Sequence, residues 1–340
     1  MLPKSIRSRK HVEVGEFLTR TGFEHAPRVA GTLSLRRGRR EPVVLGLLQE
    51  YVPNEGDAWS FTLDTLAEYF ERGLAEQPEL PDVTVTVAYL LELAEQPEPD
   101  ERALEMVGSY LQSAETMGER TAQMHRALVA SAGGDADFQP EAFSTLYQRS
   151  LYQSMRNLTG NVFDVVQRSL DVEPRLEELL GRREELLGRF RALIGGKLSA
   201  QRTRVHGDYH LGQLLFTGRD FVITDFEGEP ARPASERRLK RSPLRDVAGM
   251  LRSFSYAKWS ATRSGALDRW ERDTRKAFLS AYAAAALGSG LFESFDDVRG
   301  LLRLFEMEKA LYELRYEFNN RPDWLQVPLA GILGMLEEGE

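Results

Sequence analysis

The 340-residue sequence contains no cysteine, and it contains no hydrophobic run of the roughly 18 residues that a membrane-spanning helix needs. The missing thiols exclude disulfide bonds, thiolate zinc sites and a cysteine nucleophile. The opening residues, MLPK, do not show the pattern of a secretory signal peptide. We therefore expect a cytoplasmic protein that does not contact the membrane.

Basic residues are outnumbered, with 44 Lys and Arg against 52 Asp and Glu, which gives a net charge of −8. This balance argues against a general nucleic-acid surface. A basic cluster at 36–40, RRGRR, is expected to form the charged tip of a hairpin. The hydrophobic fraction of 42% is sufficient for a sizeable core, and the length suggests two or three lobes.

The order of the expected elements divides the chain near residue 52. A helix over 12–19 and two antiparallel strands over 32–35 and 43–49 form a small N-terminal lobe, 1–52, and the remainder, 53–340, is mostly helical. An acidic excursion over 75–101 contains the sequence AEQPE twice. Helices are expected over 58–72, 103–128, 141–158, 162–170, 174–196, 244–259, 267–285 and 295–319.

The strongest chemical signal is a pair of motifs around one predicted hairpin. Residues 205–213 read VHGDYHLGQ, and residues 225–230 read DFEGEP. Between them, a turn at 217–220 separates two short β-rich runs. Kinases use this arrangement to hold an acceptor hydroxyl and the metal ions of a nucleotide. The spacing predicts Asp208 as the proton acceptor, with Gln213 and Asp225 as Mg²⁺ ligands.

Two further segments are candidates for binding. The end of the second strand lies where a kinase would give backbone hydrogen bonds to adenine, although an ordinary strand edge explains it equally well; its residues are Gln49, Glu50, Tyr51 and Val52. In the last long helix, Lys309, Tyr312 and Tyr316 fall on the face opposite an apolar stripe. Aromatic rings and a lysine at this spacing suit a sugar, and burial against another helix is the alternative.

Several motifs in this order resemble those of maltokinases, which are aminoglycoside-phosphotransferase-like enzymes. The resemblance runs from about residue 4 to the C-terminus, apart from the acidic excursion. It rests on HGDYHLGQ at 206–213, DFEGEPARP at 225–233, PLRDVAGMLRSF at 243–254, QEYVPNEGDAW at 49–59, EKALYELRYE at 308–317 and NNRPDW at 319–324.

The resemblance implies an α+β, two-lobed, protein-kinase-like fold with a large helical C-terminal lobe. It implies ATP-dependent formation of maltose 1-phosphate with Mg²⁺, and an association with trehalose synthase, to which such domains are also found fused. The implied maltose contacts are Lys309, Tyr312 and Tyr316, with Glu229 and Arg232 beside the metal loop.

The N-terminal lobe departs from this pattern. Lys4 aligns with the phosphate-binding lysine of a kinase strand, and Glu13 aligns with its glutamate partner on the following helix. On this mapping the chain begins after the hairpin that would cover the phosphates, so a truncated lobe with weak ATP affinity is expected. Pro3 would further disturb the lysine strand because it cannot donate a hydrogen bond.

Two other functions remain open from the sequence. A kinase for an amino alcohol or aminoglycoside would need an acid-rich site for its cationic acceptor, whereas Lys309 and the two tyrosines favour a neutral polyol. A truncated, non-catalytic module would explain the incomplete N-terminal lobe. The presence of Asp208, Gln213 and Asp225 argues against that module, because it has no chemical need for all three.

Overall fold

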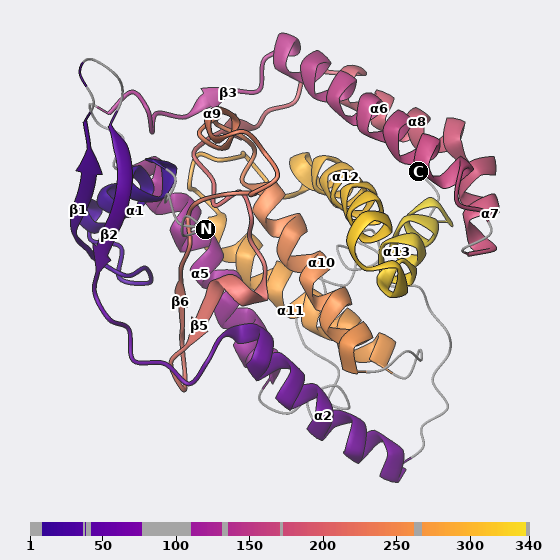
Figure 1. The fold of residues 1–340 in the computed structure, drawn as a ribbon, viewed down its shortest axis with the longest axis horizontal. Coiled ribbons are helices and arrows are strands. Elements are labelled where there is room, and N and C mark those ends of the chain that lie inside the picture. The colour runs from indigo at the N-terminus through magenta and orange to yellow at the C-terminus, as the bar shows by residue number, and fades with distance from the viewer. Residues whose placement is uncertain are drawn as a thin grey trace.

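A computed structural model describes residues 9–36, 38, 42–76, 110–130, 135–170, 173–261 and 267–337 (Figure 1). The acidic excursion lies almost entirely outside these ranges, as does most of the basic cluster at 36–40. Within them the chain is a mainly helical α+β structure with three two-stranded antiparallel sheets.

The N-terminal part is one helix and one hairpin. Helix α1 (Arg9–Thr21) packs its apolar face, including Phe17, inward, and strands β1 (Val29–Leu35) and β2 (Val43–Gln49) follow. The strands pair antiparallel from Val29 opposite Gln49 to Leu35 opposite Val43, with two irregularities in register. The predicted hairpin is therefore confirmed, and Figure 1 shows it at one edge of the molecule beside α1.

The centre of the larger part is a stack of four long helices. Helix α5 (Tyr110–Ala130) lies along α11 (Asp268–Ala286), and α10 (Leu244–Ala261) contacts both α11 and α12 (Asp296–Asn320). A side chain at Gly118 of α5 would overlap the backbone carbonyl of Phe278 in α11, so the close approach of these helices requires glycine there.

The remaining helices surround this stack. Helix α6 (Thr145–Gln167) begins at Ser144, whose hydroxyl accepts a hydrogen bond from the Tyr147 amide at 3.2 Å. Figure 1 shows α6 and α8 at the edge opposite the β1–β2 hairpin. The other elements are α2 (Ala58–Glu76), α7 (Arg175–Gly181), α8 (Arg183–Arg191), α9 (Ala234–Arg237), α13 (Gln326–Glu337), β3 (Glu141–Ala142), β4 (Gln201–Arg202), and the 3₁₀ turns Ala192–Ile194, Leu211–Gln213 and Pro322–Trp324.

A second hairpin positions the two sequence motifs. Strands β5 (Leu214–Phe216) and β6 (Phe221–Ile223) pair antiparallel, which confirms the predicted strand–turn–strand. The segment after β2 joins this hairpin, since the Glu55 amide donates to the Phe216 carbonyl at 2.8 Å and Asp57 forms a bridge with Leu215. On the far side, Arg120 of α5 binds Asp220 of the turn with two hydrogen bonds, at 2.9 and 3.0 Å.

Two predictions about the helical part were wrong. The single helix expected over 174–196 is instead α7, α8 and a 3₁₀ turn, with a break at Arg182. The expected break between helices 141–158 and 162–170 does not exist, because α6 runs continuously through Gly160. Its buried residues, among them Leu151, Met155, Val162 and Phe163, recur at helical spacing on both sides of that glycine and hold the helix together by packing. None of the described helices combines the length and apolarity needed to cross a bilayer.

Candidate active site

Asp208 lies on a loop whose shape is fixed by a buried carboxylate. Asp246, in the first turn of α10, accepts hydrogen bonds from the His206 amide at 2.7 Å and the Gly207 amide at 2.8 Å. His125 of α5 lies 3.2 Å from the same carboxylate. Burial opposes the charged form of Asp246, but the hydrogen bond and charge of His125 outweigh it and hold the pKa of Asp246 below its usual value. Asp246 thus holds the loop that carries Asp208, the predicted catalytic loop, in place.

Lys10 of α1 supports the same loop from the other side. Its buried ammonium donates to the His206 carbonyl at 2.5 Å. A Cβ at Gly207 would lie 2.9 Å from Lys10 Nζ, and a Cβ at Gly228 would lie 2.7 Å from it. The two loops can therefore approach the ammonium this closely only because both positions are glycine. Burial lowers the pKa of Lys10 to about 8. Lys10 therefore joins α1 to the two loops that carry the motifs.

Oxygen ligands for a cation gather just after β6. Asp225 adopts a left-handed backbone conformation, with φ of 57°, and about half of its side chain is exposed. Strain of this kind in a residue other than glycine is characteristic of functional positions. One ligand atom each from His11, Asp225 and Glu227 lies within 4.8 Å of the others. The carboxylates fit Mg²⁺, which prefers oxygen, and Asp225 Oδ1 lies 3.4 Å from His11 Nδ1.

Gln213 completes this side of the site at the start of β5. Its amide nitrogen lies 3.3 Å from His210 Nε2, which leaves the amide oxygen as the potential ligand. The Gln213 carbonyl accepts the Thr224 amide at 2.8 Å, so β5 and the residue preceding Asp225 are joined directly. Burial lowers the pKa of His210 to about 4, and His210 is therefore neutral at pH 7.

The predicted adenine-binding segment is a short extended stretch after β2. Gln49 is the last strand residue, and the Glu50 amide already donates to the Arg28 carbonyl at 2.8 Å. Tyr51 is exposed, while the Val52 carbonyl accepts the Asn54 side chain at 2.8 Å. The Glu50 amide and the Val52 carbonyl are therefore already hydrogen-bonded within the protein, and a nucleotide would have to bind other backbone groups of this segment.

The predicted phosphate-binding pair is only partly described. Lys4 lies outside the described residues. Glu13 is on α1, where its carboxylate contacts Arg238 at 2.7 Å, Arg9 at 2.8 Å and Arg204 at 3.4 Å. Within the described part of the chain, Glu13 joins α1 to the larger lobe through arginines.

Two cavities meet at Asp208. The first, of about 560 Å³, is called the acidic cavity because its described lining has five carboxylates and two cations. Arg252 binds Glu313 at 2.9 Å and Arg321 binds Glu317 at 2.7 Å. The other three carboxylates, Asp57, Asp208 and Glu229, therefore face one remaining cation, Lys309.

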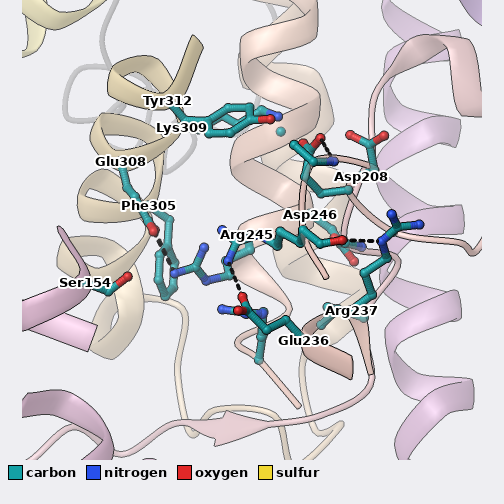
Figure 2. A pocket seen from close by; sticks show the side chains of 18 of the residues that line it. Ser154, Asp208, Glu236, Arg237, Arg245, Asp246, Phe305, Glu308, Lys309 and Tyr312 are labelled. Atoms are coloured by element: carbon teal, nitrogen blue, oxygen red, sulfur yellow. Dashed lines mark hydrogen bonds and ion pairs between the residues drawn. The ribbon is translucent and has the colours of Figure 1, made fainter. Parts of the chain in front are cut away.

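The second cavity, of about 370 Å³, is called the basic cavity because its described lining has seven cations and five carboxylates. It lies between the catalytic loop, the segment after Gly228, α6 and α12, and Figure 2 shows it extending from Asp208 to Ser154. Of the predicted substrate residues, Glu229, Lys309 and Tyr312 line both cavities. Tyr316 lines only the acidic cavity, and Arg232 lines only the basic one.

The environment of Asp208 suits a proton acceptor. Burial raises the pKa of Asp208 to about 6, with smaller upward contributions from Glu229 and Asp225, while Lys309 opposes the shift. A carboxylate with this pKa is mostly ionised at pH 7 and is a stronger base than an exposed one. The structure thus places a tuned carboxylate between the candidate metal ligands and the two cavities.

Several of these features could not be inferred from the sequence. Lys10 and His11 resemble surface residues of an amphipathic helix, and only the packing of α1 shows that both are buried against the motifs. Glu227 lies within the DFEGEP motif, but its spacing alone does not indicate that it is a potential metal ligand. The acidic character of the first cavity depends on Asp57, which is about 150 residues from Asp208 in sequence and was expected only to begin a helix.

No protein-family model matches this chain. A glucosamine kinase from Mycolicibacterium smegmatis is 35% identical over 140 residues, which is 39% of this chain and 34% of that protein. A glucosamine kinase from Streptacidiphilus jiangxiensis is 26% identical over 332 residues, which is 94% of this chain and 64% of that protein. The matched regions thus span less than two thirds of either curated relative.

Solved structures give the same result at the level of fold. A glucosamine kinase in crystal form B has a TM-score of 0.73 at 23% identity, covering 99% of this chain and 71% of that one. A glucosamine kinase in complex with glucosamine, ADP and inorganic phosphate has a TM-score of 0.72 at 22% identity, covering 97% and 69%. The chain therefore shares the two-lobed, kinase-like fold of these solved structures, while the truncated N-terminal lobe remains a prediction.

These similarities correct the maltokinase identification, which was wrong. Its strongest residues, Asp208, Gln213 and Asp225, are those predicted to serve phosphoryl transfer, which kinases of many acceptors share, and they carry no information on the acceptor. Neither maltose nor a trehalose synthase partner is supported by the relatives found here.

Proposed function

We propose that this chain is an ATP-dependent sugar kinase whose acceptor is an amino sugar of the glucosamine type. The observation that carries the proposal is the position of Asp208, which is shared by the acidic cavity and the candidate metal side of the loop. ATP, as expected from the sequence, agrees with the ADP held by a structural neighbour. The curated relatives are longer than the region that matches this chain, so the activity of this chain is proposed from its own site.

The reaction requires little covalent chemistry from the protein. The acceptor oxygen forms a bond to the γ-phosphorus of ATP, the bond from that phosphorus to the ADP oxygen breaks, and the hydroxyl proton passes to Asp208. Asp225 and Gln213, with Glu227 nearby, would hold Mg²⁺, which neutralises charge on the phosphates. Lys10 and Asp246 keep the Asp208 loop in position throughout.

The charge of the acidic cavity supports a cationic acceptor. The sequence favoured a neutral polyol because Lys309 and two tyrosines share one face of a helix. In the folded chain, the carboxylates of Asp57 and Glu229 line the same cavity as these three side chains. An ammonium group gains a charge-assisted hydrogen bond from such carboxylates, whereas a neutral hydroxyl gains less. Tyr312 provides an aromatic surface for the sugar ring in the same cavity.

The test is ADP release with ATP, Mg²⁺ and matched sugars. Glucosamine should support turnover, and N-acetylglucosamine and glucose, which lack the charge, should support at least about tenfold less. Maltose serves as the negative control. Equal rates with glucosamine and glucose would contradict the role of the acidic cavity, and no turnover with any sugar would contradict the kinase assignment for this chain.

The pH dependence follows from Asp208. Because burial raises the pKa of Asp208 to about 6, kcat/KM should fall tenfold per pH unit below about pH 6 and level off above it. The direction follows because only the ionised carboxylate can accept the proton. A profile measured with glucosamine between pH 4.5 and about 7, where its amine stays mostly charged, checks the expectation. A rate that remains constant down to pH 4.5 would contradict it.

A further inference from the structure

The basic cavity carries more positive charge than its own carboxylates balance. Two of its arginines are paired, since Arg245 binds Glu308 at 2.7 Å and Arg232 lies 3.9 Å from Glu236. Figure 2 shows Arg245 in the middle of the cavity, with Phe305 and Glu308 beside it. The Arg245 guanidinium lies 4.7 Å from the centre of the Phe305 ring, which fixes its plane.

Arg241 is one of the cations in this cavity that have no ion pair among the described residues. It precedes α10, and its backbone pairs with Thr203 at 2.8 and 2.9 Å. Within the described part of the chain, its guanidinium has no hydrogen bond and no ion pair, although it lines the cavity and is partly buried. Burial, together with the charges of Arg245 and Arg232, lowers the pKa of Arg241 to about 10. A partly buried cation in this position is destabilising unless an anion joins it.

Other polar groups in the cavity are also available. The Nε of Arg245 is buried without a hydrogen-bond partner among the described residues. On the α6 wall, Ser154, Asn157 and Asn161 line the cavity, and no described residue hydrogen-bonds to their side chains. The cavity therefore offers guanidinium donors at one wall and hydroxyl and amide groups at the facing wall.

We propose that the basic cavity is a binding site for a small phosphate monoester, such as a monosaccharide phosphate. The phosphate is taken by Arg241 beside Arg245, and hydroxyl groups of the ligand are taken by Ser154, Asn157 and Asn161. A phosphate ester carries nearly two negative charges at pH 7 and accepts forked hydrogen bonds from guanidinium groups, which matches the surplus here better than a carboxylate does.

This site adjoins the acidic cavity at Asp208, Glu229, Lys309 and Tyr312, whereas its arginines Arg241 and Arg245 and the α6 side chains line the basic cavity alone. Asp225 and Gln213, the candidate metal ligands, do not line the basic cavity, whereas Asp208 lies at its end. The phosphate ester can come from two sources, namely the product of this chain or a sugar phosphate made by another kinase. The inference goes beyond the proposed function, and its test requires no turnover.

The test measures binding by calorimetry to the full chain without nucleotide. Probes are glucosamine 6-phosphate, glucose 6-phosphate and inorganic phosphate, with glucosamine at the same ionic strength as the control. Arg241→Gln should weaken binding of the esters by about tenfold or more. The change removes no hydrogen bond or ion pair between this guanidinium and a described residue, so the variant is expected to fold. The matched control is Arg156→Gln, an exposed α6 arginine outside the cavity lining, which should bind as the wild type does.

The outcomes separate the sources. Tighter binding of glucosamine 6-phosphate supports a site for the product type, because its ammonium reaches the acidic cavity. Equal binding of both esters supports a site for sugar phosphates in general. The proposal is overturned if neither ester binds the wild type, if Arg241→Gln leaves the affinity unchanged, or if Arg156→Gln weakens binding as much as Arg241→Gln does.

Discussion

Replacing Asp208 with asparagine is expected to lower phosphorylation by about 10²–10⁴-fold, because the amide cannot accept the hydroxyl proton. The same change should stabilise the protein. Burial raises the pKa of Asp208 from 3.8 to about 6. At pH 7 the ionised carboxylate therefore lowers the free energy of unfolding, and replacing it with a neutral amide removes this destabilisation. Allowing for partial exposure, the gain is about 1–3 kcal/mol, which is a rise of about 2–5 °C in Tm.

The sign can be checked with pH. The folded pKa of Asp208 lies above its unfolded value, so the wild type loses stability as pH rises from about 4 to about 6. The Tm difference between wild type and Asp208→Asn should therefore shrink below pH 4, where the carboxyl is neutral in both states. Asp64→Asn, an exposed change on α2, is the matched control and should alter neither rate nor Tm. An Asp208→Asn protein less stable than the wild type at pH 7 would contradict this account.

Removing the Asp246 carboxylate is expected to have the largest effect on stability. Asp246→Ala leaves the amides of His206 and Gly207 and the ring of His125 without their acceptor in a buried site. Losing one member of a buried charged network costs about 3–5 kcal/mol. Urea unfolding should show this as a lower midpoint with an unchanged slope.

Asp246→Asn is the graded comparison. The amide keeps one acceptor oxygen. The stability of the Asp246→Asn variant should therefore lie between that of the wild type and that of Asp246→Ala. Activity of the folded fraction should fall in both variants, because the Asp208 loop is no longer held by both amides. An alanine variant as stable as the wild type would show that Asp246 does not support the loop.

The local arrangement of the motifs could be predicted from the sequence because it depends on short-range signals. Turn residues at 217–220 between two β-rich runs specify the β5–β6 hairpin, and the hairpin alone brings Gln213 and Asp225 together. The α1 and β1–β2 elements follow from periodicity in the same way.

Features that depend on packing could not be predicted. Gly160 has the appearance of a helix break, yet the buried residues on both sides keep α6 continuous. Helix α13 (Gln326–Glu337) was not expected, because Pro328 and two glycines mask its pattern, although proline is tolerated in a first turn. Glu229 was expected near the substrate, but the charge of the acceptor site also depends on Asp57, which meets Glu229 only in the fold and which the maltokinase resemblance did not supply.

The position of Lys10 has a consequence for how this sequence can vary. Its ammonium occupies the space where side chains at positions 207 and 228 would lie, so an alanine at either glycine collides with it. Both glycines also have a positive φ, 83° at Gly207 and 74° at Gly228, so a homologue with a larger residue at either position would need a different backbone there as well as a shorter residue at position 10. Such a homologue would also have to replace the hydrogen bond that Lys10 gives to the His206 carbonyl. Lys10, Gly207 and Gly228 therefore form a set that evolution has to change together, although position 10 is about 200 residues from the other two.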